Sequence, residues 1–475
     1  LICCETGNRY TPRLLKAVAR TADPDSTLTT LSQVSDSLGG KGVLWELFSF
    51  NPPSMNLYVE MCAASPYLSS ILVGSPGMID ELMDGLVVNK LPTRRDLADH
   101  LDELCAGAED LEPILHSFKN AGLLRIGVRD ILGKDDAEHV GAALSDLAET
   151  CLERIALTEF DRLVERLGLP TIGDGPEAGR PCGFVLLALG KLGGRELSYR
   201  SDLDLVFLYE AEGPTQPRRP RRGESTTNQH FFGELGQRII KAAAHLGSSG
   251  RLYEIDPRLR PTGKSGPLAV SLLEFERYYA EGYGRLWERQ ALCRARVIFG
   301  DEAIAARATE AVHRAAFGIE CPPDAIEQLR DMRRRLEVDA GPNDLKRGPG
   351  GTLDVEFLVQ SLQLRYAGAD ARLRKPDILE ALIGLHRAGK LNDADCEWLQ
   401  SSYRFLRSVQ GRLRLLSMTA RTRLPGEVRE LAKLARSLGY ADGEELASDV
   451  RRHMRLNRER FDAWFDPQRR TAAVE

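Results

Sequence analysis

Residues 190–205 read GKLGGRELSYRSDLDL, and this stretch indicates the fold class more clearly than any other part of the 475-residue chain. A short apolar run, Phe184 to Leu189, precedes it and is typical of a buried strand that ends at Gly190. A second apolar run, Leu203 to Tyr209, follows the glycines. The glycine spacing matches neither a P-loop nor a dinucleotide-binding turn. We therefore expect a flexible glycine turn that connects two buried strands.

Two carboxylates stand at the head of the second of these strands. Because side chains alternate along a strand, Asp202 and Asp204 are expected to point to one face while Leu203 points into the core. Neighbouring carboxylates repel each other and raise each other's pKa unless a cation lies between them. Mg²⁺ commonly fills this role because it binds oxygen ligands and bridges to substrate phosphates. An Asp-x-Asp pattern also occurs at solvated strand ends, so the pair alone is weak evidence for a metal site.

A third strand is expected from Leu252 to Leu259, and its alternation separates charged from apolar side chains. The charged side chains that share one face are Glu254, Asp256, Arg258 and Arg260. One interpretation is a set of mutual salt bridges, but such exposed pairs contribute only about 0–1 kcal/mol. The interpretation that we favour makes Asp256 a third metal ligand. It assigns phosphate oxygens to the guanidinium groups of Arg258 and Arg260.

Helical patterns precede and follow this middle part, so the expected fold class is α+β. We expect an N-terminal helical region over residues 1–133, an α/β domain over 134–305 and a C-terminal helical bundle over 306–475. Thr93 and Asp377 are expected to cap helices, and Ala137 to Leu167 is expected to form a long one.

The composition indicates a soluble globular protein, with 43% hydrophobic and 28% charged residues. A net charge of −5 gives no global attraction to nucleic acid. The arginine-rich segment 217–223 is expected to form a solvated loop, and binding of an acidic or nucleic-acid partner by this loop is the less favoured alternative. No apolar stretch is long enough to cross a bilayer, and the scattered cysteines are typical of buried, reduced thiols. We therefore expect a cytoplasmic location. Because the sequence begins with Leu1, we expect a piece of a longer protein.

The glycine turn, the Asp-x-Asp pair and a later carboxylate together resemble the polymerase-β-like nucleotidyltransferases. More narrowly, residues 190–204 and 256–261 are similar to glutamine synthetase adenylyltransferase. The further blocks that carry this resemblance are Ser265–Leu268, Trp287–Leu292, Arg294–Arg296 and Asp344–Phe357.

The resemblance implies a small mixed sheet with helical domains on either side, ATP as a substrate and about two Mg²⁺ ions. It implies that the metal ligands and catalytic residues are Asp202, Asp204 and Asp256. The implied nucleotide- or phosphate-binding residues are Gly193, Gly194, Ser201, Arg258, Arg260 and Lys346. Asp354 and Glu356 would support the site, although the segment 348–351 also reads as a simple turn before a helix that starts near Thr352.

The resembled family contains two related halves with opposite activities. One half transfers AMP from ATP to a tyrosine of glutamine synthetase, and the other half removes it by phosphorolysis. A single Asp-x-Asp block implies one half, and residues 31–86 are similar to the stretch that precedes the adenylylating half. A PII-type signal protein and glutamine are the implied regulators. The alternatives are the phosphorolytic half and a non-catalytic nucleotide-binding module, which the intact set of three aspartates disfavours.

Overall fold

The computed structural model describes residues 5–37, 48, 52–78, 90–217, 225–247 and 250–466. The N-terminal part is helical and comprises α1 (Glu5–Val18), α2 (Pro24–Ser37), α4 (Pro52–Ala64), α5 (Pro66–Gly74), α7 (Arg94–Cys105), α8 (Glu112–Ile131) and α9 (Ala137–Leu167). The middle part contains β1 (Leu169–Pro170), β2 (Phe184–Ala188), α10 (Gly190–Gly193), β3 (Leu203–Tyr209), β4 (Thr215–Gln216), α11 (Asn228–Ala244), β5 (Leu246–Gly247), β6 (Gly250–Arg251), β7 (Ile255–Asp256), η1 (Gly263–Ser265), β8 (Ala269–Ser271), α12 (Leu272–Ala280), α13 (Leu286–Leu292) and β9 (Arg296–Phe299). The C-terminal helices are α14 (Glu302–Phe317), α15 (Ala325–Glu337), α16 (Thr352–Tyr366), η2 (Ala371–Leu373), α17 (Ile378–Arg387), α18 (Asp393–Leu416), α19 (Val428–Ser437) and α20 (Gly443–Phe465).

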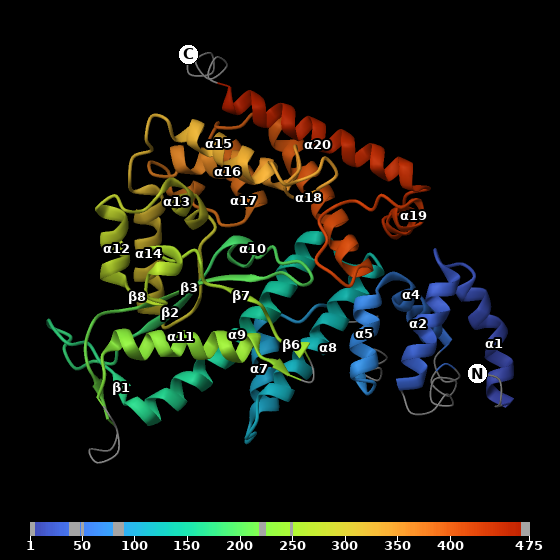
Figure 1. Cartoon of the computed structure of the whole chain (residues 1–475), viewed down its shortest axis with the longest axis horizontal. Helices are drawn as coiled ribbons and strands as arrows, with labels where there is room; N and C mark the ends of the chain where they lie inside the picture. Colours follow the sequence, from blue (N-terminus) through green and yellow to red (C-terminus); the bar gives the residue numbers. More distant parts are fainter. Residues whose placement is uncertain are drawn as a thin grey trace.

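A small mixed sheet lies at the centre of the molecule (Figure 1). Its strands follow the order β7-β3-β2-β9, and β8 pairs with the far end of β3 on the same edge as β7. β2 runs antiparallel to β3, whereas β7 and β8 run parallel to β3. The expected α+β fold with a small mixed sheet and helical flanks is therefore confirmed.

The sheet is buried on both faces because alternate residues of each strand enter different apolar cores. Leu203, Leu205 and Phe207 join one core together with residues of α9 and α11. Val206 and Leu208 join a second core together with residues of α12, α13 and α14. Full burial of such a side chain contributes roughly 1.5–3 kcal/mol, so this alternation holds β3 firmly in the middle of the fold.

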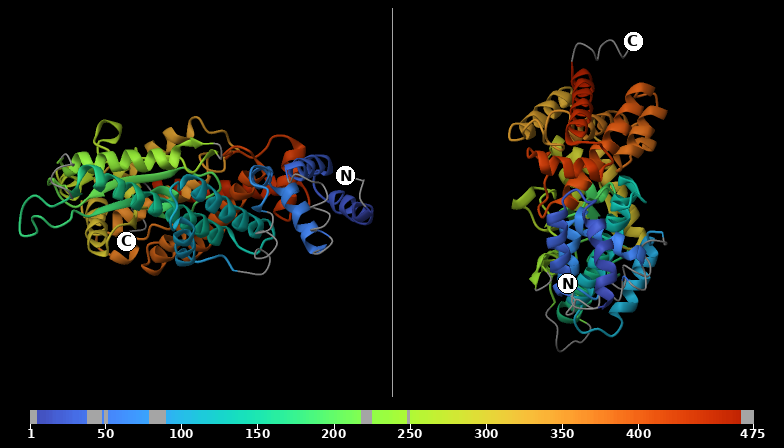
Figure 2. Two further views of the ribbon diagram at one scale, coloured as in Figure 1. Left: turned by 90° about the horizontal axis from the view of Figure 1, so that it is seen from below. Right: turned by 90° about the vertical axis from the view of Figure 1, so that its right-hand side faces the viewer.

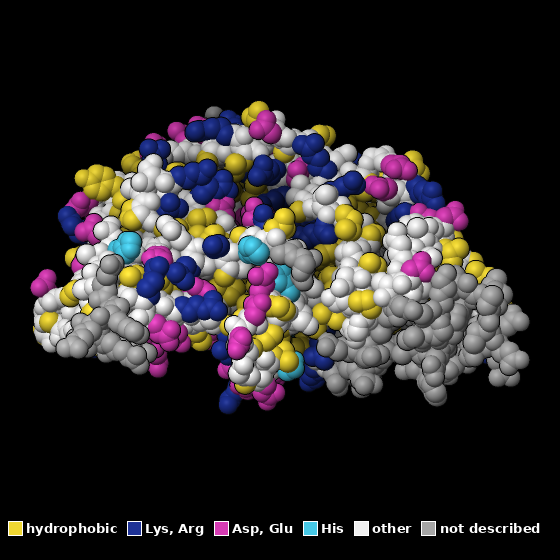
Figure 3. All heavy atoms as spheres, turned by 60° about the horizontal axis from the view of Figure 1, so that its bottom comes forward, with side chains coloured by type: hydrophobic (Ala, Val, Ile, Leu, Met, Phe, Trp, Pro, Cys, Tyr) yellow, Lys and Arg dark blue, Asp and Glu magenta, His cyan; other side chains and the backbone are white. Residues whose placement is uncertain are grey.

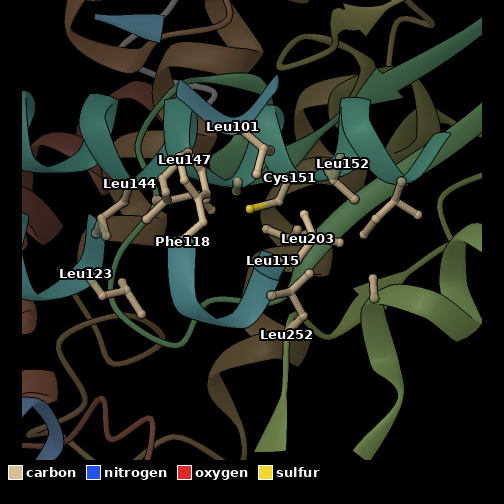
Figure 4. Close-up of a cluster of buried hydrophobic side chains, with 14 of the residues drawn as sticks. Leu101, Leu115, Phe118, Leu123, Leu144, Leu147, Cys151, Leu152, Leu203 and Leu252 are labelled. Atoms are coloured by element: carbon tan, nitrogen blue, oxygen red, sulfur yellow. The ribbon is translucent and has the colours of Figure 1, made fainter. Parts of the chain in front are cut away.

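Leu203 shows how this packing orients the two aspartates beside it. Its side chain points toward Leu115, Cys151 and Leu252 in the cluster between α8, α9 and β3 (Figure 4). The side chain of Leu203 is 0% exposed, as expected from the sequence. Because neighbouring strand residues face opposite ways, burial of Leu203 turns Asp204 toward the other face of the sheet, where the C-terminal helices lie.

The expected third strand is much shorter than predicted. In place of Leu252 to Leu259, the structure has only Ile255–Asp256 as β7. Pro257 has no N–H to continue the ladder, and the chain turns immediately after it. The predicted alternation of charged residues along one strand face is therefore wrong beyond Asp256.

The helices predicted from capping signals are confirmed. Thr93 caps α7 in a reciprocal capping box with Asp96, and Asp377 caps α17 by accepting the Glu380 N–H. The long helix α9 spans Ala137–Leu167 as predicted. In each case local side-chain-to-backbone bonds define the helix start, so sequence reasoning can find it.

The C-terminal helices share a core with the sheet. Ile304 and Ala308 of α14 pack in the same cluster as Val185 and Leu187 of β2, so the predicted boundary at residue 305 crosses continuous apolar packing. The division into three regions stays a prediction. The helices α1, α2, α4 and α5 lie together at one end of the elongated molecule (Figure 2).

Three further expectations concern the surface and the thiols. Among the described residues no single helix has the length and hydropathy to cross a membrane; one pair, Met55–Ala64 with Pro66–Gly74, reaches them only when taken together across a 115° bend. On the face in Figure 3, Lys and Arg side chains form several groups interspersed with Asp and Glu. Residues 218–223 of the arginine-rich segment lie outside the described residues. Cys62, Cys105, Cys151 and Cys293 are buried free thiols, as expected.

Candidate active site

Asp204 and Asp256 lie directly beside each other at one edge of the sheet. They are register partners in the parallel pair β3–β7, and the Leu203 N–H donates to the Glu254 carbonyl at 2.8 Å to close this pairing. Asp202 precedes β3 and is exposed. Burial, and then the charges of Asp202 and Asp256, raise the pKa of Asp204 to about 6. The carboxylate of Asp204 therefore lies within the electric fields of the other two, although Asp256 is 52 residues further along the chain than Asp204.

Gly190 packs directly against the carboxylate of Asp204. A Cβ at this position would lie 2.3 Å from Oδ2 of Asp204, and the glycine has a φ of +55°. Both facts exclude an ordinary side chain, because the left-handed conformation is strained and the space is taken. The turn after β2 therefore requires glycine so that the carboxylate of Asp204 can lie against it.

Close packing explains why residues 193 and 194 are glycines. The structure does not show their amides free to bind a phosphate. Their amides already donate to the carbonyls of Leu189 and Gly190, at 2.9 and 3.2 Å. A Cβ on Gly193 would lie 1.8 Å from the Arg294 carbonyl, and one on Gly194 would lie 2.3 Å from the Arg294 guanidinium. The predicted approach of these amides to a nucleotide phosphate stays a prediction.

Replacement of Gly193 by alanine tests which role matters. We expect Gly193→Ala to lower the free energy of unfolding by about 1–3 kcal/mol, because the added methyl group overlaps the Arg294 carbonyl. Chemical denaturation measures this loss. Gly233→Ala is the matched control in helix α11, where a Cβ meets nothing within 4 Å and alanine should stabilise by up to about 1 kcal/mol. A Gly193→Ala protein of wild-type stability that binds ATP more weakly would instead assign the glycine to the phosphates.

Arg258 holds Asp256, which differs from its predicted contact with phosphate. Its Nε lies 2.8 Å from both carboxylate oxygens, Nη2 forms an ion pair with Oδ2, and the Arg258 N–H donates to Oδ1 at 3.0 Å. These hydrogen bonds keep the pKa of Asp256 below its usual value, against the opposing effect of burial. The carboxylate is thus ionised and oriented by Arg258. A phosphate contact of Arg258 stays a prediction.

The position of Arg260 does not support its predicted contact with phosphate. Its guanidinium is buried and donates to three backbone carbonyls, those of Pro257, Gly266 and Pro267, at 2.7–3.3 Å. Because β7 ends at Asp256, Arg260 leaves the strand face on which the alternation had placed it. The side chain instead closes the loop of residues 257–267.

The aspartates fit Mg²⁺ by the chemistry of their donors. Carboxylate oxygens are the ligands that Mg²⁺ prefers, and a cation beside Asp204 would relieve the repulsion that raises its pKa. Within the described ranges no three His, Cys, Asp or Glu side chains converge closely enough to form a metal site as they stand. The carboxylate of Asp256 is paired with Arg258 in this arrangement. Asp202 and Asp204 would hold the metal, with Asp256 as a third donor once Arg258 turns away.

Cationic side chains lie across from the aspartates. Lys346 counteracts the rise in the pKa of Asp204, so its ammonium group lies within electrostatic range of that carboxylate. Arg414 donates to Ser201 Oγ at 3.1 Å and to the Tyr199 carbonyl at 2.9 Å. Ser201 Oγ also accepts the Ser198 N–H at 3.2 Å, so this hydroxyl orders the loop before Asp202. Its predicted contact with phosphate stays a prediction.

A buried ion-pair network joins this loop to the C-terminal helices. Arg294 pairs with Glu196 at 2.8 Å and contacts Glu356 at 3.4 Å, and all three side chains are at most 10% exposed. Glu196 also accepts the Tyr403 hydroxyl and the Ile378 N–H. Burial opposes ionisation of Glu196, but Arg294 and Arg407 outweigh it and lower its pKa. Glu356 thus belongs to the buried network around Arg294, and its predicted support of the active site stays a prediction.

Asp354 lies on the opposite side of α16 from Glu356, because two residues along a helix correspond to a turn of about 200°. It is buried against Arg333, at 2.5 Å, and it accepts the Gly350 N–H at 2.7 Å. Arg458 is a third partner, at 3.4 Å. Asp354 therefore stabilises the turn before α16 within the helical region and does not face the aspartates.

Sequence reasoning missed several side chains around the site, namely Lys191, Glu196, Arg294, Tyr403, Arg407 and Arg414. Lys191 and Glu196 stand inside the glycine stretch, and Arg294 stands inside another block of the resemblance. Arg407 and Arg414 each follow a buried leucine of α18, which places them at the border of its apolar stripe. This position beside the apolar side of the helix could have indicated them from the sequence, because a cation there often faces a neighbouring element.

The sheet, the glycine turn and the paired aspartates place this chain in the α+β fold class of the polymerase-β-like nucleotidyltransferases, with helices on either side of a small mixed sheet. Residues 55–311 match the family model described as glutamate-ammonia ligase adenylyltransferase, and residues 325–465 match one described as GlnD PII-uridylyltransferase. The chain belongs to the glutamate-ammonia ligase adenylyltransferase family.

Curated relatives carry the name bifunctional glutamine synthetase adenylyltransferase/adenylyl-removing enzyme. The relative from Thioalkalivibrio sulfidiphilus is 36% identical over 419 residues, which cover 85% of this chain and 42% of the relative. The relative from Nitrosococcus oceani is 35% identical over 430 residues, covering 87% of this chain and 43% of the relative. The chain thus spans less than half the length of these relatives.

Proposed function

We propose that this chain transfers AMP from ATP to a tyrosine hydroxyl of glutamine synthetase and releases pyrophosphate. The observation that carries the proposal is the parallel register of Asp204 with Asp256 beside the exposed Asp202. Three carboxylates at one open sheet edge, opposite Lys346 and Arg414, suit a substrate that carries both metal ions and phosphates.

In this reaction the tyrosine oxygen attacks the α-phosphorus, and the bond from that phosphorus to the β-phosphate oxygen breaks. Bound Mg²⁺ would neutralise charge on the triphosphate and favour departure of pyrophosphate. The tyrosine, with a reference pKa of about 10, must lose its proton. Asp256 is a weak acceptor while Arg258 lowers its pKa. Arg258 must therefore turn away before Asp256 can assist this proton transfer.

The partners and the location follow from this proposal. Glutamine synthetase is the protein substrate, as the names of the curated relatives suggest. A PII-type signal protein and glutamine are the proposed regulators, and the location is the cytoplasm. The similarity of residues 31–86 to the stretch before an adenylylating half favours the forward direction. Residues 38–47, 49–51 and 79–86 of that segment lie outside the described residues.

A paired labelling assay tests the direction. Purified chain is incubated with Mg²⁺, α-labelled ATP and unmodified glutamine synthetase, and separately with labelled AMP–glutamine synthetase and phosphate. We expect label to enter glutamine synthetase in the first reaction and no labelled ADP to appear in the second. Release of ADP alone would assign the phosphorolytic activity. Absence of both reactions would support a non-catalytic nucleotide-binding module.

A further inference from the structure

Arg200 stands two residues before Asp202 and has a backbone conformation that is uncommon for an arginine. Its φ is +57°, in the left-handed region. Among the described residues other than glycine, only Arg195 and Thr262 also have a positive φ. This region is strained for a residue with a Cβ, and such a conformation persists only where neighbouring groups hold it. The loop before Asp202 therefore needs a group that holds Arg200.

The ring of Tyr67 on α5 lies against the side chain of Arg200. The guanidinium carbon is 4.1 Å from the centre of the ring, which is a close cation–π contact. Nη2 of Arg200 also donates to Met418 Sδ at 3.9 Å, and a thioether is a weak acceptor. Within the described ranges Arg200 forms no ion pair with a carboxylate. Arg200 and Tyr67 are both half-buried, so water screens their contact only in part.

Helix α5 is firmly seated and can therefore support this loop. Ser65 caps the helix, is 0% exposed and donates to the Leu415 carbonyl of α18 at 2.9 Å. The same helix packs beside α8 (Figure 1), where a Cβ at Gly127 would lie 2.5 Å from Leu68 Cδ1. Tyr67 thus projects from a helix that is held by both α8 and α18.

The residues on either side of Arg200 are held by another element. Arg414 of α18 donates to the Tyr199 carbonyl at 2.9 Å and to Ser201 Oγ at 3.1 Å. These hydrogen bonds fix residues 199 and 201 and leave the side chain of Arg200 to the ring of Tyr67. Without that ring, Arg200 can relax toward an ordinary φ, which changes the direction of the chain into β3.

We propose that Tyr67 is a positioning residue for Asp202. Its ring holds Arg200 in the left-handed conformation, and this conformation sets the direction of the chain into Asp202, one of the expected metal ligands. Tyr67 lies 135 residues before Asp202 in the sequence, so the N-terminal helices become a part of the catalytic unit. The inference rests on the proposed function for the identity of the reaction, whereas the contact between Tyr67 and Arg200 can be tested without substrates.

Hydrogen exchange of the full chain, followed by mass spectrometry of peptides that cover residues 197–203, measures how firmly the loop is held. Tyr67→Leu removes the ring but keeps the strain at Arg200, so we expect the loop amides to exchange about three- to tenfold faster. Tyr67→Phe keeps a ring face and should exchange within about twofold of the wild type. Tyr283→Leu is the matched control, because Tyr283 is 65% exposed between α12 and α13.

Substitutions of Arg200 separate strain from packing. Arg200→Ala and Arg200→Gly both remove the guanidinium, but only glycine adopts a φ of +57° without strain. Relative to intrinsic rates, we expect the alanine variant to exchange at least about threefold faster than the glycine variant. Adding Tyr67→Leu to Arg200→Gly should change exchange by less than about twofold, because no strained residue remains to be held.

Two results of this cycle would overturn the proposal. Equal acceleration by Tyr67→Leu in the wild-type and Arg200→Gly backgrounds would show that Tyr67 acts only by packing α5. Wild-type exchange in Tyr67→Leu would show that the ring does not hold the loop.

Binding of Mn²⁺ to the chain, followed by electron paramagnetic resonance, connects the loop to Asp202. Mn²⁺ prefers the same octahedral oxygen ligands as Mg²⁺. We expect Tyr67→Leu to weaken Mn²⁺ binding about three- to tenfold and the same substitution in the Arg200→Gly background to change it by less than about twofold. Unaltered Mn²⁺ affinity in a Tyr67→Leu chain whose loop exchanges faster would overturn the positioning of Asp202.

The assay of AMP transfer separates this inference from the proposed function. The expected exchange and Mn²⁺ results in a chain that fails to label glutamine synthetase would uphold the role of Tyr67 and refute the proposed function. Label transfer by a chain in which Tyr67→Leu alters neither loop exchange nor Mn²⁺ binding would do the reverse.

Discussion

Asp202→Asn is expected to lower the rate of AMP transfer by at least about a thousandfold while leaving the fold intact. Asp202 is exposed before β3, so no packing is lost. The amide cannot supply the negative charge that a divalent cation requires. Removal of one charge also reduces repulsion on Asp204. The rate of label transfer from ATP and the thermal unfolding midpoint are the two measurements.

Asp174→Asn is the matched control for this substitution. Asp174 is exposed in the loop between β1 and β2 and makes no ion pair within the described ranges, so we expect wild-type rates. An Asp202→Asn protein with wild-type turnover would remove Asp202 from the catalytic set. An inactive protein with a clearly lower unfolding midpoint would show that Asp202 is structural, which its exposure argues against.

Arg294→Met is expected to lower the free energy of unfolding by about 3–5 kcal/mol, because it leaves the buried carboxylate of Glu196 without its main counter-charge. Arg294 is 4% exposed and Glu196 is 8% exposed, so water cannot substitute. Chemical denaturation measures the loss. Arg314→Met is the control, because Arg314 pairs with Glu276 at the surface and should contribute at most about 1 kcal/mol.

The pH dependence of this loss has a definite sign. In the wild type, the lowered pKa of Glu196 gives stability that is present above the unfolded-state pKa and is lost as the pH falls through the folded-state value. Without Arg294, burial should raise that pKa, so the variant avoids the buried charge by protonation at acid pH. We expect the difference in the free energy of unfolding between the wild type and the Arg294→Met variant to be larger at about pH 7 than at about pH 5. Adding Glu196→Gln to Arg294→Met should restore part of the stability. A loss of stability that changes neither with pH nor with this second substitution would refute the ion-pair explanation.

Residues 252–260 show how far the alternation rule could predict the structure from the sequence. Period-two alternation predicted the environments of Leu203 and Asp204 correctly, because β3 is a regular strand with partners on both sides. The same rule failed after Asp256, because Pro257 ends β7 and Arg260 finds carbonyl acceptors in its own loop. Alternation holds only while the ladder of hydrogen bonds continues.

Local rules therefore determined the helix caps, the buried strands, the glycine turn and the orientation of Leu203 and Asp204, since each depends on residues within a few positions along the chain. Tertiary structure alone decided that Asp256 lies beside Asp204, that Arg258 holds it and that Asp354 and Glu356 face opposite sides of α16. It also placed Lys191 within electrostatic range of Lys346 and of Arg407 and Arg414 on α18. The physical reason for the long-range contacts is separation: Asp256 stands 52 residues after Asp204, and Lys346 stands 155 residues after Lys191. Only the packing of the sheet and of the C-terminal helices against it brings such groups together.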